Sequence, residues 1–187
     1  MLVIEDGFSS SLNRLNFVFL HEMVVTECIK DYGVLSLFGE NFGPFEVGKK
    51  YKLPLFSAIP FIEKGILQVA LIDKCDNIDV QRYAIEERDD SMLIKRSNKY
   101  FLNKIREFRR FMENEIIKKH KPKIDIDRYQ SYTFNIINSR LLKILKLSMA
   151  ELSLDDERRL TISEKVLYEN LYKLIKIWRN FFQFDFV

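Results

Sequence analysis

The chain has 187 residues, 47% of them hydrophobic and 30% charged, with 6 Gly, 4 Pro and a formal net charge of +3. So few Gly and Pro exclude a collagen-like or low-complexity chain, and 16 Phe with 8 Tyr exclude intrinsic disorder, because disordered chains lack the aromatic residues that build a core. The composition predicts a globular protein of one or two domains. An aromatic content this high also leaves residues with which to bind a partner.

The residue types that carry out catalysis are few and scattered. Cys28 and Cys75 are too few for a disulfide framework, and with only His21 and His120 the chain has no ligand spacing for zinc. Neither histidine has a nearby Ser or Cys that would form a nucleophile pair, and the glycine-rich motifs that hold nucleotide phosphates are absent from the sequence. We therefore expect a protein that is not an enzyme and uses no metal or other cofactor.

The sequence gives no sign of export or of membrane insertion. Glu5 and Asp6 stand where a secretory signal needs positive charge, and no apolar run approaches the roughly 18 residues that cross a bilayer. These features predict a cytoplasmic protein without a membrane association.

The first part of the chain has the pattern of a small β-rich domain, which we expect over residues 23–74. Residues 1–12 are predicted to be a poorly ordered tail, followed by a short helical turn at 13–22. β-branched and apolar runs at 23–30 and 34–38 predict two strands, and the turn signal Asp31-Tyr32-Gly33 between them predicts a hairpin.

The segment that follows is rich in Gly and Pro. Tyr51 to Leu53 has an extended pattern, and Pro54 is suited to the first turn of a short helix that continues through Lys64 and ends at Gly65. Pro60 weakens that helix, because proline interrupts the hydrogen bonds of a helix interior.

From residue 77 onward the hydrophobic period changes from two to between three and four, which predicts a helical domain over residues 75–187. One helix is expected at 78–90, and a second at 98–119 ends before Pro122. The second helix has one apolar stripe, formed by Phe101, Ile105, Phe108, Met112 and Ile116.

Two further helices follow in the sequence. The third is predicted to begin after Asp127, which with Gln130 resembles a capping pair, and residues 153–159 form a polar connection. The fourth begins at Thr161, where Thr161 and Glu164 have the spacing of a capping box. The predicted fold is therefore α+β: a small N-terminal β-rich domain followed by a larger all-α helical bundle.

Positive charge is concentrated in one stretch of the helical region. Residues 95–123 contain 11 Lys and Arg against 3 Glu, a net charge of +8. Such a field is typical of a surface that contacts nucleic-acid phosphates, but we favour the other interpretation, the charged outer face of an amphipathic helix. The residues that would contact DNA or a partner are Arg106, Arg109, Arg110, Lys118 and Lys119.

Aromatic residues are concentrated at the other end of this region. Trp178, Phe181, Phe182, Phe184 and Phe186 fall within the last ten residues. One interpretation is that they close the end of the bundle, and the other is that they bind a partner; the pattern favours neither.

The segment from Leu37 to Ala58 reads LFGENFGPFEVGKKYKLPLFSA, and it resembles the GINS replication factors. The likeness consists of an L-x-G-x-x-x-G-P-F turn, a Gly three residues after the Phe, and an extended segment ending in L-P-L. The residues of this signature turn are Gly39, Gly43, Pro44, Phe45, Gly48, Leu53 and Pro54. Gly-Pro sets a tight turn, the Phe fills a small core, and the second Pro starts a helix.

The resemblance extends more weakly over residues 17–178, including 78–112, 140–148 and 160–173. It is closest to the GINS subunits in which the β-rich domain precedes the helical domain, the same order that the periodicity gives. The chain departs from some eukaryotic members in having Ile72 to Asp76 where they have a proline pair and a Trp. Without a long acidic tail, it is more similar to archaeal members.

The resemblance implies a non-catalytic subunit of the DNA replication fork. Archaeal subunits of this class pair with a permuted GINS subunit as a two-plus-two tetramer, which binds the MCM replicative helicase and a RecJ-like protein, so the chain is expected at replication forks in the nucleoid. We predict that the subunit interface uses aromatic helix faces, made of Phe101, Ile105, Phe108, Tyr168, Tyr172, Trp178, Phe181 and Phe182. The alternative is a direct DNA-binding protein that uses the basic residues of 95–123; under the GINS interpretation, contact with DNA is only indirect.

Overall fold

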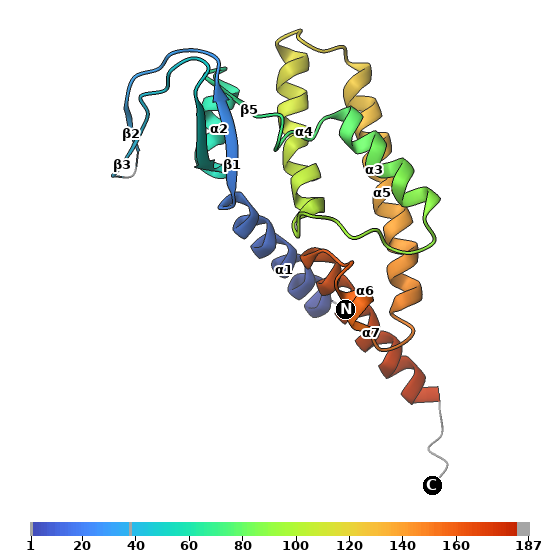
Figure 1. Ribbon diagram of the computed structural model, residues 1–187. Coiled ribbons are helices and arrows are strands. Elements are labelled where there is room, and N and C mark those ends of the chain that lie inside the picture. Colours follow the sequence, from blue (N-terminus) through green and yellow to red (C-terminus); the bar gives the residue numbers. More distant parts are fainter. Residues whose placement is uncertain (1, 38, 183–187) are drawn as a thin grey trace.

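The structure is a computed structural model that describes residues 2–37 and 39–182. Its strands all lie within residues 23–69 and its long helices mainly after them, so the predicted α+β class is confirmed (Figure 1). The elements are α1 (Leu2–Leu20), β1 (Met23–Cys28), β2 (Leu35–Leu37), β3 (Glu40–Phe42), β4 (Lys50–Pro54), α2 (Leu55–Glu63), β5 (Leu67–Val69), α3 (Asn77–Asp89), α4 (Phe101–Ile117), α5 (Ile124–Leu147), α6 (Leu154–Glu157) and α7 (Ile162–Phe182).

The N-terminal segment is a helix and not the predicted tail. α1 begins at Leu2 and packs against α4 and α7, which lie far from it in the sequence. Phe19 is buried in the main core, and the Asn16 side chain donates a hydrogen bond of 2.8 Å to the Glu107 carboxylate of α4. The tail prediction was wrong for residues 2–12, because Gly and Ser weaken local helix propensity whereas contacts with distant helices stabilise α1. The helical turn predicted at 13–22 coincides with the last part of α1.

The main sheet has three antiparallel strands in the order β4-β1-β5. Its central strand β1 alternates as a half-buried strand should, with Val24, Thr26 and Cys28 buried. The predicted hairpin between residues 23–30 and 34–38 is wrong, because β2 pairs with β3 in a separate two-stranded arm. Apolar alternation predicts that a segment is a strand but does not select its partner. Phe38, which the prediction included, lies outside the described residues.

The signature turn closes this arm against the sheet. The Tyr32 N–H donates to the Phe45 carbonyl at 2.9 Å, and the Phe45 N–H donates to the Tyr32 carbonyl at 2.8 Å. Phe45 is buried against the Phe61 ring, with centroids 4.9 Å apart. Gly43 has φ +97°, and a Cβ there would lie 3.0 Å from the Gly33 carbonyl oxygen. The structural roles predicted for the glycine and the Phe of this turn are confirmed.

The short helix α2 agrees with the prediction within one residue. Pro54 is its N-cap residue, and Gly65, at φ +68°, follows the C-cap residue Lys64. The Ile66 N–H donates to the Phe61 carbonyl and the Gly65 N–H donates to the Ile62 carbonyl, which satisfies the free carbonyls of the last turn. The prediction missed β5, the short edge strand that begins directly afterwards.

The β-rich and helical regions share one core. The largest buried cluster includes Val24 of β1 and Ala58 of α2 together with Phe101, Ile105 and Phe108 of α4. The regions predicted as 23–74 and 75–187 therefore pack directly on each other.

The helices at 78–90 and 98–119 are confirmed as α3 and α4, and α3 packs along α5 (Figure 1). α5 begins earlier than predicted, at Ile124, and its N-cap residue Lys123 makes no side-chain cap. The predicted capping pair at Asp127 is therefore wrong; Asp127 lies in the first turn of α5, where a carboxylate favours the helix dipole. At α7 the Thr161 N–H donates to the Glu164 carboxylate at 2.8 Å, which is one half of the predicted capping box.

Candidate partner-binding surface

The stripe predicted for α4 faces the interior of this chain. Phe101, Ile105 and Phe108 are each no more than 5% exposed and belong to the main core. We therefore correct the interface prediction for these three residues, because they have no free surface to offer a partner. An amphipathic stripe is first of all the face that a helix buries in its own domain.

Tyr168, in the first half of α7, is also internal, so the interface prediction for it is corrected too. Tyr168 is buried with Leu93, Ile144 and Leu160, and its hydroxyl donates to the Ala150 carbonyl at 2.8 Å. The partly exposed ring of Tyr172 stacks on Tyr168, with centroids 5.8 Å apart. These two tyrosines help to attach α7 to the bundle.

The second half of α7 has a large apolar surface exposed to solvent. The exposed fractions are 64% for Trp178, 80% for Phe181 and 60% for Phe182, and Leu174 and Ile177 are exposed beside them. We call these five residues the α7 apolar surface. Trp178 and Phe181 each contact Phe182, with ring centroids 5.1 and 5.0 Å apart. The rings therefore pack on each other and leave most of their area in water.

This surface settles one alternative that the sequence left open. Within the described residues, Trp178, Phe181 and Phe182 do not close the end of the bundle, because α7 extends past its neighbours there (Figure 1). Phe184 and Phe186 lie outside the described residues. An exposed apolar cluster of this kind is typical of a surface that binds another molecule.

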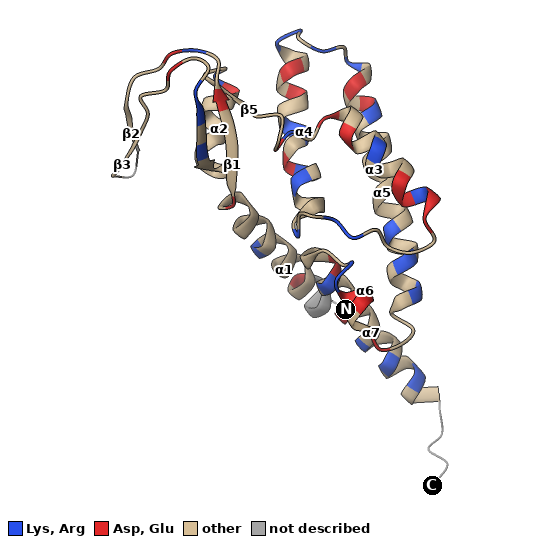
Figure 2. Ribbon diagram, viewed as in Figure 1, with Lys and Arg blue, Asp and Glu red and all other residues tan. Residues whose placement is uncertain are grey.

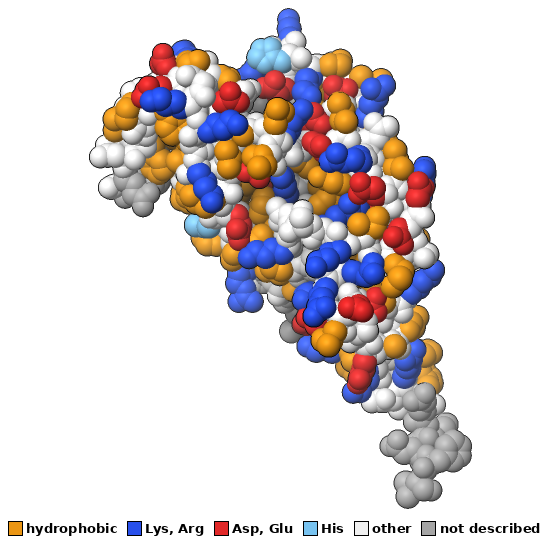
Figure 3. Space-filling model, viewed as in Figure 1, with side chains coloured by type: hydrophobic (Ala, Val, Ile, Leu, Met, Phe, Trp, Pro, Cys, Tyr) orange, Lys and Arg blue, Asp and Glu red, His pale blue; other side chains and the backbone are white. Residues whose placement is uncertain are grey.

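The charged residues within the last turns of α7 are all basic. Lys173, Lys176 and Arg179 lie between the apolar residues, and the sequence from 170 to 182 contains no Asp or Glu. Figure 2 shows blue and no red on the last turns of α7, and Figure 3 shows apolar and basic side chains together at this end of the molecule. A matching partner would have an apolar groove with an acidic rim.

A second exposed cluster was not predicted from the sequence. His21, at the end of α1, lies between the rings of Phe17 and Phe56, with centroids 4.5 and 4.8 Å away. Phe17 and Phe56 are 62% and 43% exposed. The signal in the sequence was weak, since these residues come from two helices that are far apart in the chain.

The fold pairs some basic side chains of residues 95–123 with carboxylates and leaves others exposed. Arg106 lies 3.8 Å from Glu107, Arg109 lies 2.9 Å from Glu113, and Arg110 lies 2.9 Å from Glu63 of α2. Lys118 and Lys119 are exposed at the end of α4. Because α2 supplies Glu63, the local field is weaker than the +8 of the linear count indicates.

One arginine of the helical region is at the centre of a buried ion network. Arg140 of α5 donates to both Glu164 oxygens of α7 and, at 2.7 Å, to Glu87 of α3. Glu87 also accepts from Lys143 at 2.7 Å and from Arg96 at 3.0 Å. This network joins α3, α5 and α7, and it leaves no carboxylate free for catalysis.

The electrostatics of the network favour ionised side chains. Burial alone would raise the pKa of Glu87, but hydrogen bonds and positive charge from Lys143 and Arg140 outweigh burial and hold its pKa below the usual range. Burial likewise opposes the charge of Arg140, and Glu164 and Glu87 raise its pKa above the ordinary value. Glu87 and Arg140 are therefore both charged at neutral pH.

The groups considered for catalysis are not brought together. His21 Nδ1 makes a 2.9 Å hydrogen bond with the Phe17 carbonyl oxygen, and His120 Nδ1 lies 3.3 Å from a Glu115 carboxylate oxygen. Cys75 is buried, which raises its pKa to about 11 and keeps it a thiol. Among residues 2–37 and 39–182, no group of three or more His, Cys, Asp or Glu side chains could hold a metal ion.

Comparison with protein-family models and with curated proteins finds no match to this chain. In the part of the chain that the structure describes, no helix combines the length and the apolar character needed to cross a bilayer. The α7 apolar surface is therefore the candidate functional site that the structure itself supports best.

Proposed function

We propose that the chain is a non-catalytic GINS-type subunit of the DNA replication machinery. Two features support the proposal: the signature turn around Gly43 and Phe45, and a β-rich region followed by a helical bundle. On this proposal the chain assembles with a permuted GINS subunit as a two-plus-two tetramer, and the tetramer supports the MCM helicase together with a RecJ-like protein at replication forks.

The observation that carries the proposal is the exposure of the α7 apolar surface. Fully burying one large apolar side chain contributes roughly 1.5–3 kcal/mol, so covering Trp178, Phe181 and Phe182 supplies a substantial part of the free energy of a permanent interface. Exposed aromatic residues beside Arg179 match the composition of interface centres better than that of an ordinary surface, where Lys and Glu predominate.

The test is co-expression with a candidate permuted subunit, followed by mass measurement of the purified complex. The wild-type chain should give the mass of two copies of each subunit. The triple variant Trp178→Ala, Phe181→Ala, Phe182→Ala should remain folded and fail to assemble, because its substitutions remove exposed side chains. A control variant, Leu71→Ser with Ile72→Ser, also removes exposed apolar side chains, from the loop after β5, and should assemble normally.

A wild-type chain that stays a soluble monomer in the presence of the candidate subunit would contradict the proposal. Assembly of the triple variant at wild-type affinity would place α7 outside the interface and so remove the observation that carries the proposal.

The alternative, direct DNA binding through residues 95–123, makes a different prediction. It requires an affinity for bare duplex DNA that falls steeply with salt, and loss of that affinity when Arg106, Arg109 and Arg110 are changed to Glu. The ion pairs of these arginines favour the assembly proposal, because each guanidinium already has a carboxylate within 4 Å. On the assembly proposal, the charge reversal should affect contacts with the helicase or the partner subunit more than any binding of bare DNA.

A further inference from the structure

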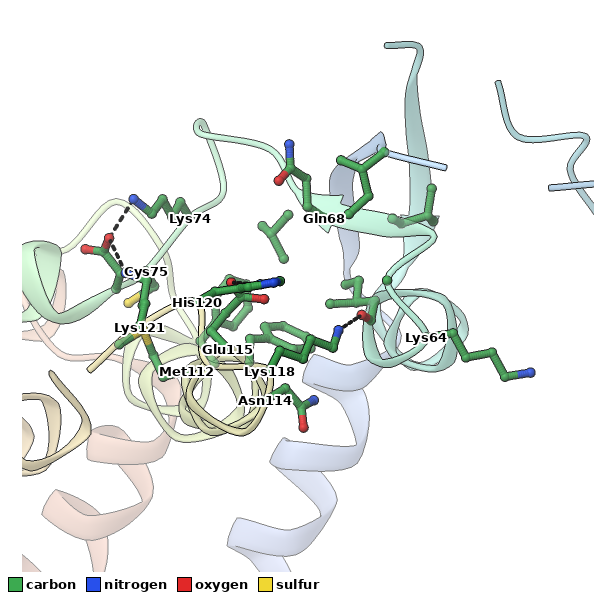
Figure 4. Close-up of a pocket in the computed structure, with 18 residues that line it drawn as sticks. Lys64, Gln68, Lys74, Cys75, Met112, Asn114, Glu115, Lys118, His120 and Lys121 are labelled. Atoms are coloured by element: carbon green, nitrogen blue, oxygen red, sulfur yellow. Dashed lines mark hydrogen bonds and ion pairs between the residues drawn. The ribbon is translucent and has the colours of Figure 1, made fainter. Parts of the chain in front are cut away.

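A cleft of about 760 Å³ lies between the β-rich region and the end of α4 (Figure 4). One wall is formed by β5 and the turn that follows α2, and the other by the second half of α4 with Lys118, His120 and Lys121. Cys75 and Asp76 line the cleft where the chain passes from the first region to the second. Clefts between packed regions are common places for a ligand to bind.

The inner surface of the cleft is mostly apolar. Ile62, Val69 and Phe111 line it and are only partly buried, and Met112 lies beside them in the core. The Phe111 ring packs edge-on against the buried ring of Phe108, with centroids 5.1 Å apart. A cleft of this kind gains free energy by accepting an apolar side chain, because water is released from both surfaces.

The rim of the cleft has an excess of positive charge. Lys74 and Lys121 lie 2.5 and 3.7 Å from one oxygen of Asp76, whose other oxygen accepts hydrogen bonds from the first turn of α3. Glu115 lies beside His120. The two lining carboxylates are therefore already engaged.

Lys118 is the rim cation best placed for a ligand. Its ammonium group is exposed, and its contact is a 3.5 Å hydrogen bond to the Ile62 carbonyl, which carries no compensating charge. Lys64, on the opposite wall, points away from the cleft (Figure 4). An anionic ligand would thus meet Lys118 first, with Lys74 and Lys121 on the same rim.

The strand that borders the cleft is the edge of the sheet. In the order β4-β1-β5, the strand β5 has a strand neighbour on one side only, and Leu67, Gln68 and Val69 line the cleft. An edge strand presents backbone N–H and C=O groups to which an extended peptide can add. The cleft therefore combines an apolar interior, a cationic rim and a strand edge.

We propose that this cleft binds an extended acidic peptide segment of another protein, with one apolar side chain of the peptide against Val69 and Phe111 and its carboxylates on Lys118 and neighbouring lysines. The site lies on a different surface from α7 and does not depend on the proposed subunit interface. The segment would align with β5, which fixes its direction and places alternate side chains into the cleft.

The test uses a fluorescein-labelled peptide, Asp-Glu-Asp-Leu-Phe-Asp-Glu-Asp, in fluorescence anisotropy with the full chain. We expect saturable binding that weakens about tenfold in Lys118→Glu, since the substitution replaces attraction with repulsion at the rim. Phe111→Ala should weaken binding to a similar extent by removing apolar contact. Lys146→Glu, an equal charge change at an exposed position of α5, should leave binding unchanged.

Control peptides separate the apolar contribution to binding from the electrostatic contribution. A peptide with Ser-Ser in place of Leu-Phe should bind about tenfold more weakly, and one with Lys in place of every Asp and Glu should not bind. The α7 triple variant should bind the acidic peptide as the wild type does, so failure of the subunit proposal and failure of this one give different results.

Three results would overturn the proposal: absence of saturable binding, equal weakening by Lys146→Glu and Lys118→Glu, or unchanged binding in both cleft variants. Displacement of the peptide by single-stranded oligothymidine, with the same dependence on Lys118, would reassign the cleft to nucleic acid. Circular dichroism of each variant checks that it is folded; if Lys118→Glu does not fold, Phe111→Ala decides the outcome.

Discussion

Replacing Arg140 by Met should destabilise the protein more than any change at an exposed arginine. Arg140 is 1% exposed and donates to Glu164, to Glu87 and to the carbonyls of Ile94 and Arg159. After the substitution Glu87 keeps Lys143 and Arg96, whereas Glu164 keeps the Thr161 N–H. The burial of a nearly unpaired Glu164 carboxylate is therefore the main penalty.

Removing one partner of a buried ion pair costs about 3–5 kcal/mol, which is a large share of the roughly 5–15 kcal/mol by which folded proteins are stable. With a urea m-value of roughly 2 kcal/mol/M, the midpoint of unfolding should fall by about 1.5–2.5 M. Urea titration followed by far-ultraviolet circular dichroism measures this shift. The comparison variant is Arg128→Met, whose exposed side chain lies 3.9 Å from Asp125 and should change stability by less than about 1 kcal/mol.

A double-mutant cycle identifies the cause of the loss. If the uncompensated Glu164 carboxylate is the main penalty, Glu164→Gln should cost about 1–3 kcal/mol less in the Arg140→Met background than in the wild type. Equal effects of Arg140→Met and Arg128→Met, or additive effects in the cycle, would refute the idea that this network joins α3, α5 and α7. Arg140→Lys keeps the charge and serves if the Met variant does not fold.

Three further predictions concern single positions. Glu87 has a lowered pKa in the folded protein, so its stabilising effect is present at neutral pH and is lost as the pH falls below the ordinary glutamate pKa and through the lower folded pKa. Urea midpoints should therefore fall more steeply with acid in the wild type than in Glu87→Gln. Gly43→Ala should lower the free energy of unfolding by about 2–3 kcal/mol, because φ is +97° and the new Cβ would lie 3.0 Å from a backbone oxygen. Gly7→Ala in α1 has open space around the new Cβ and should raise the free energy of unfolding by about 0.5–1 kcal/mol. Equal effects of the two variants in thermal unfolding would contradict this reasoning. Lys119 has φ +60° directly after α4, so Lys119→Gly should raise the melting temperature, while Lys118→Gly at the preceding αR residue should lower it.

Much of the fold follows from local patterns in the sequence. The periodicity of residues 78–90 and 98–119 predicts α3 and α4 closely, and the turn residues predict the course of the chain from Gly43 to Gly65. These features depend on neighbours within a few positions, which the sequence displays directly. The α1 helix and the pairing of β1 with β4 and β5 depend on residues tens of positions away, and local patterns carry little information about them.

The candidate surfaces were less predictable for the same reason. Charge counted along residues 95–123 omits Glu63 and Glu22, which other elements bring close to Arg110 and Lys99. The cleft beside β5 combines residues from α2, β5 and α4, and its strand was not predicted at all. A surface assembled from several segments becomes visible only when their arrangement is known.

The two halves of α7 show the limit of what hydrophobic periodicity can predict. Tyr168 and Trp178 are aromatic residues on one amphipathic helix, and periodicity gives both the same interpretation. Tyr168 meets Leu160 and Ile144, because α5 and the chain before α7 reach that far, whereas α7 continues beyond them and leaves Trp178 exposed. The length of a helix relative to its neighbours, and not its pattern, therefore decides which of its aromatic residues are buried and which remain exposed to solvent.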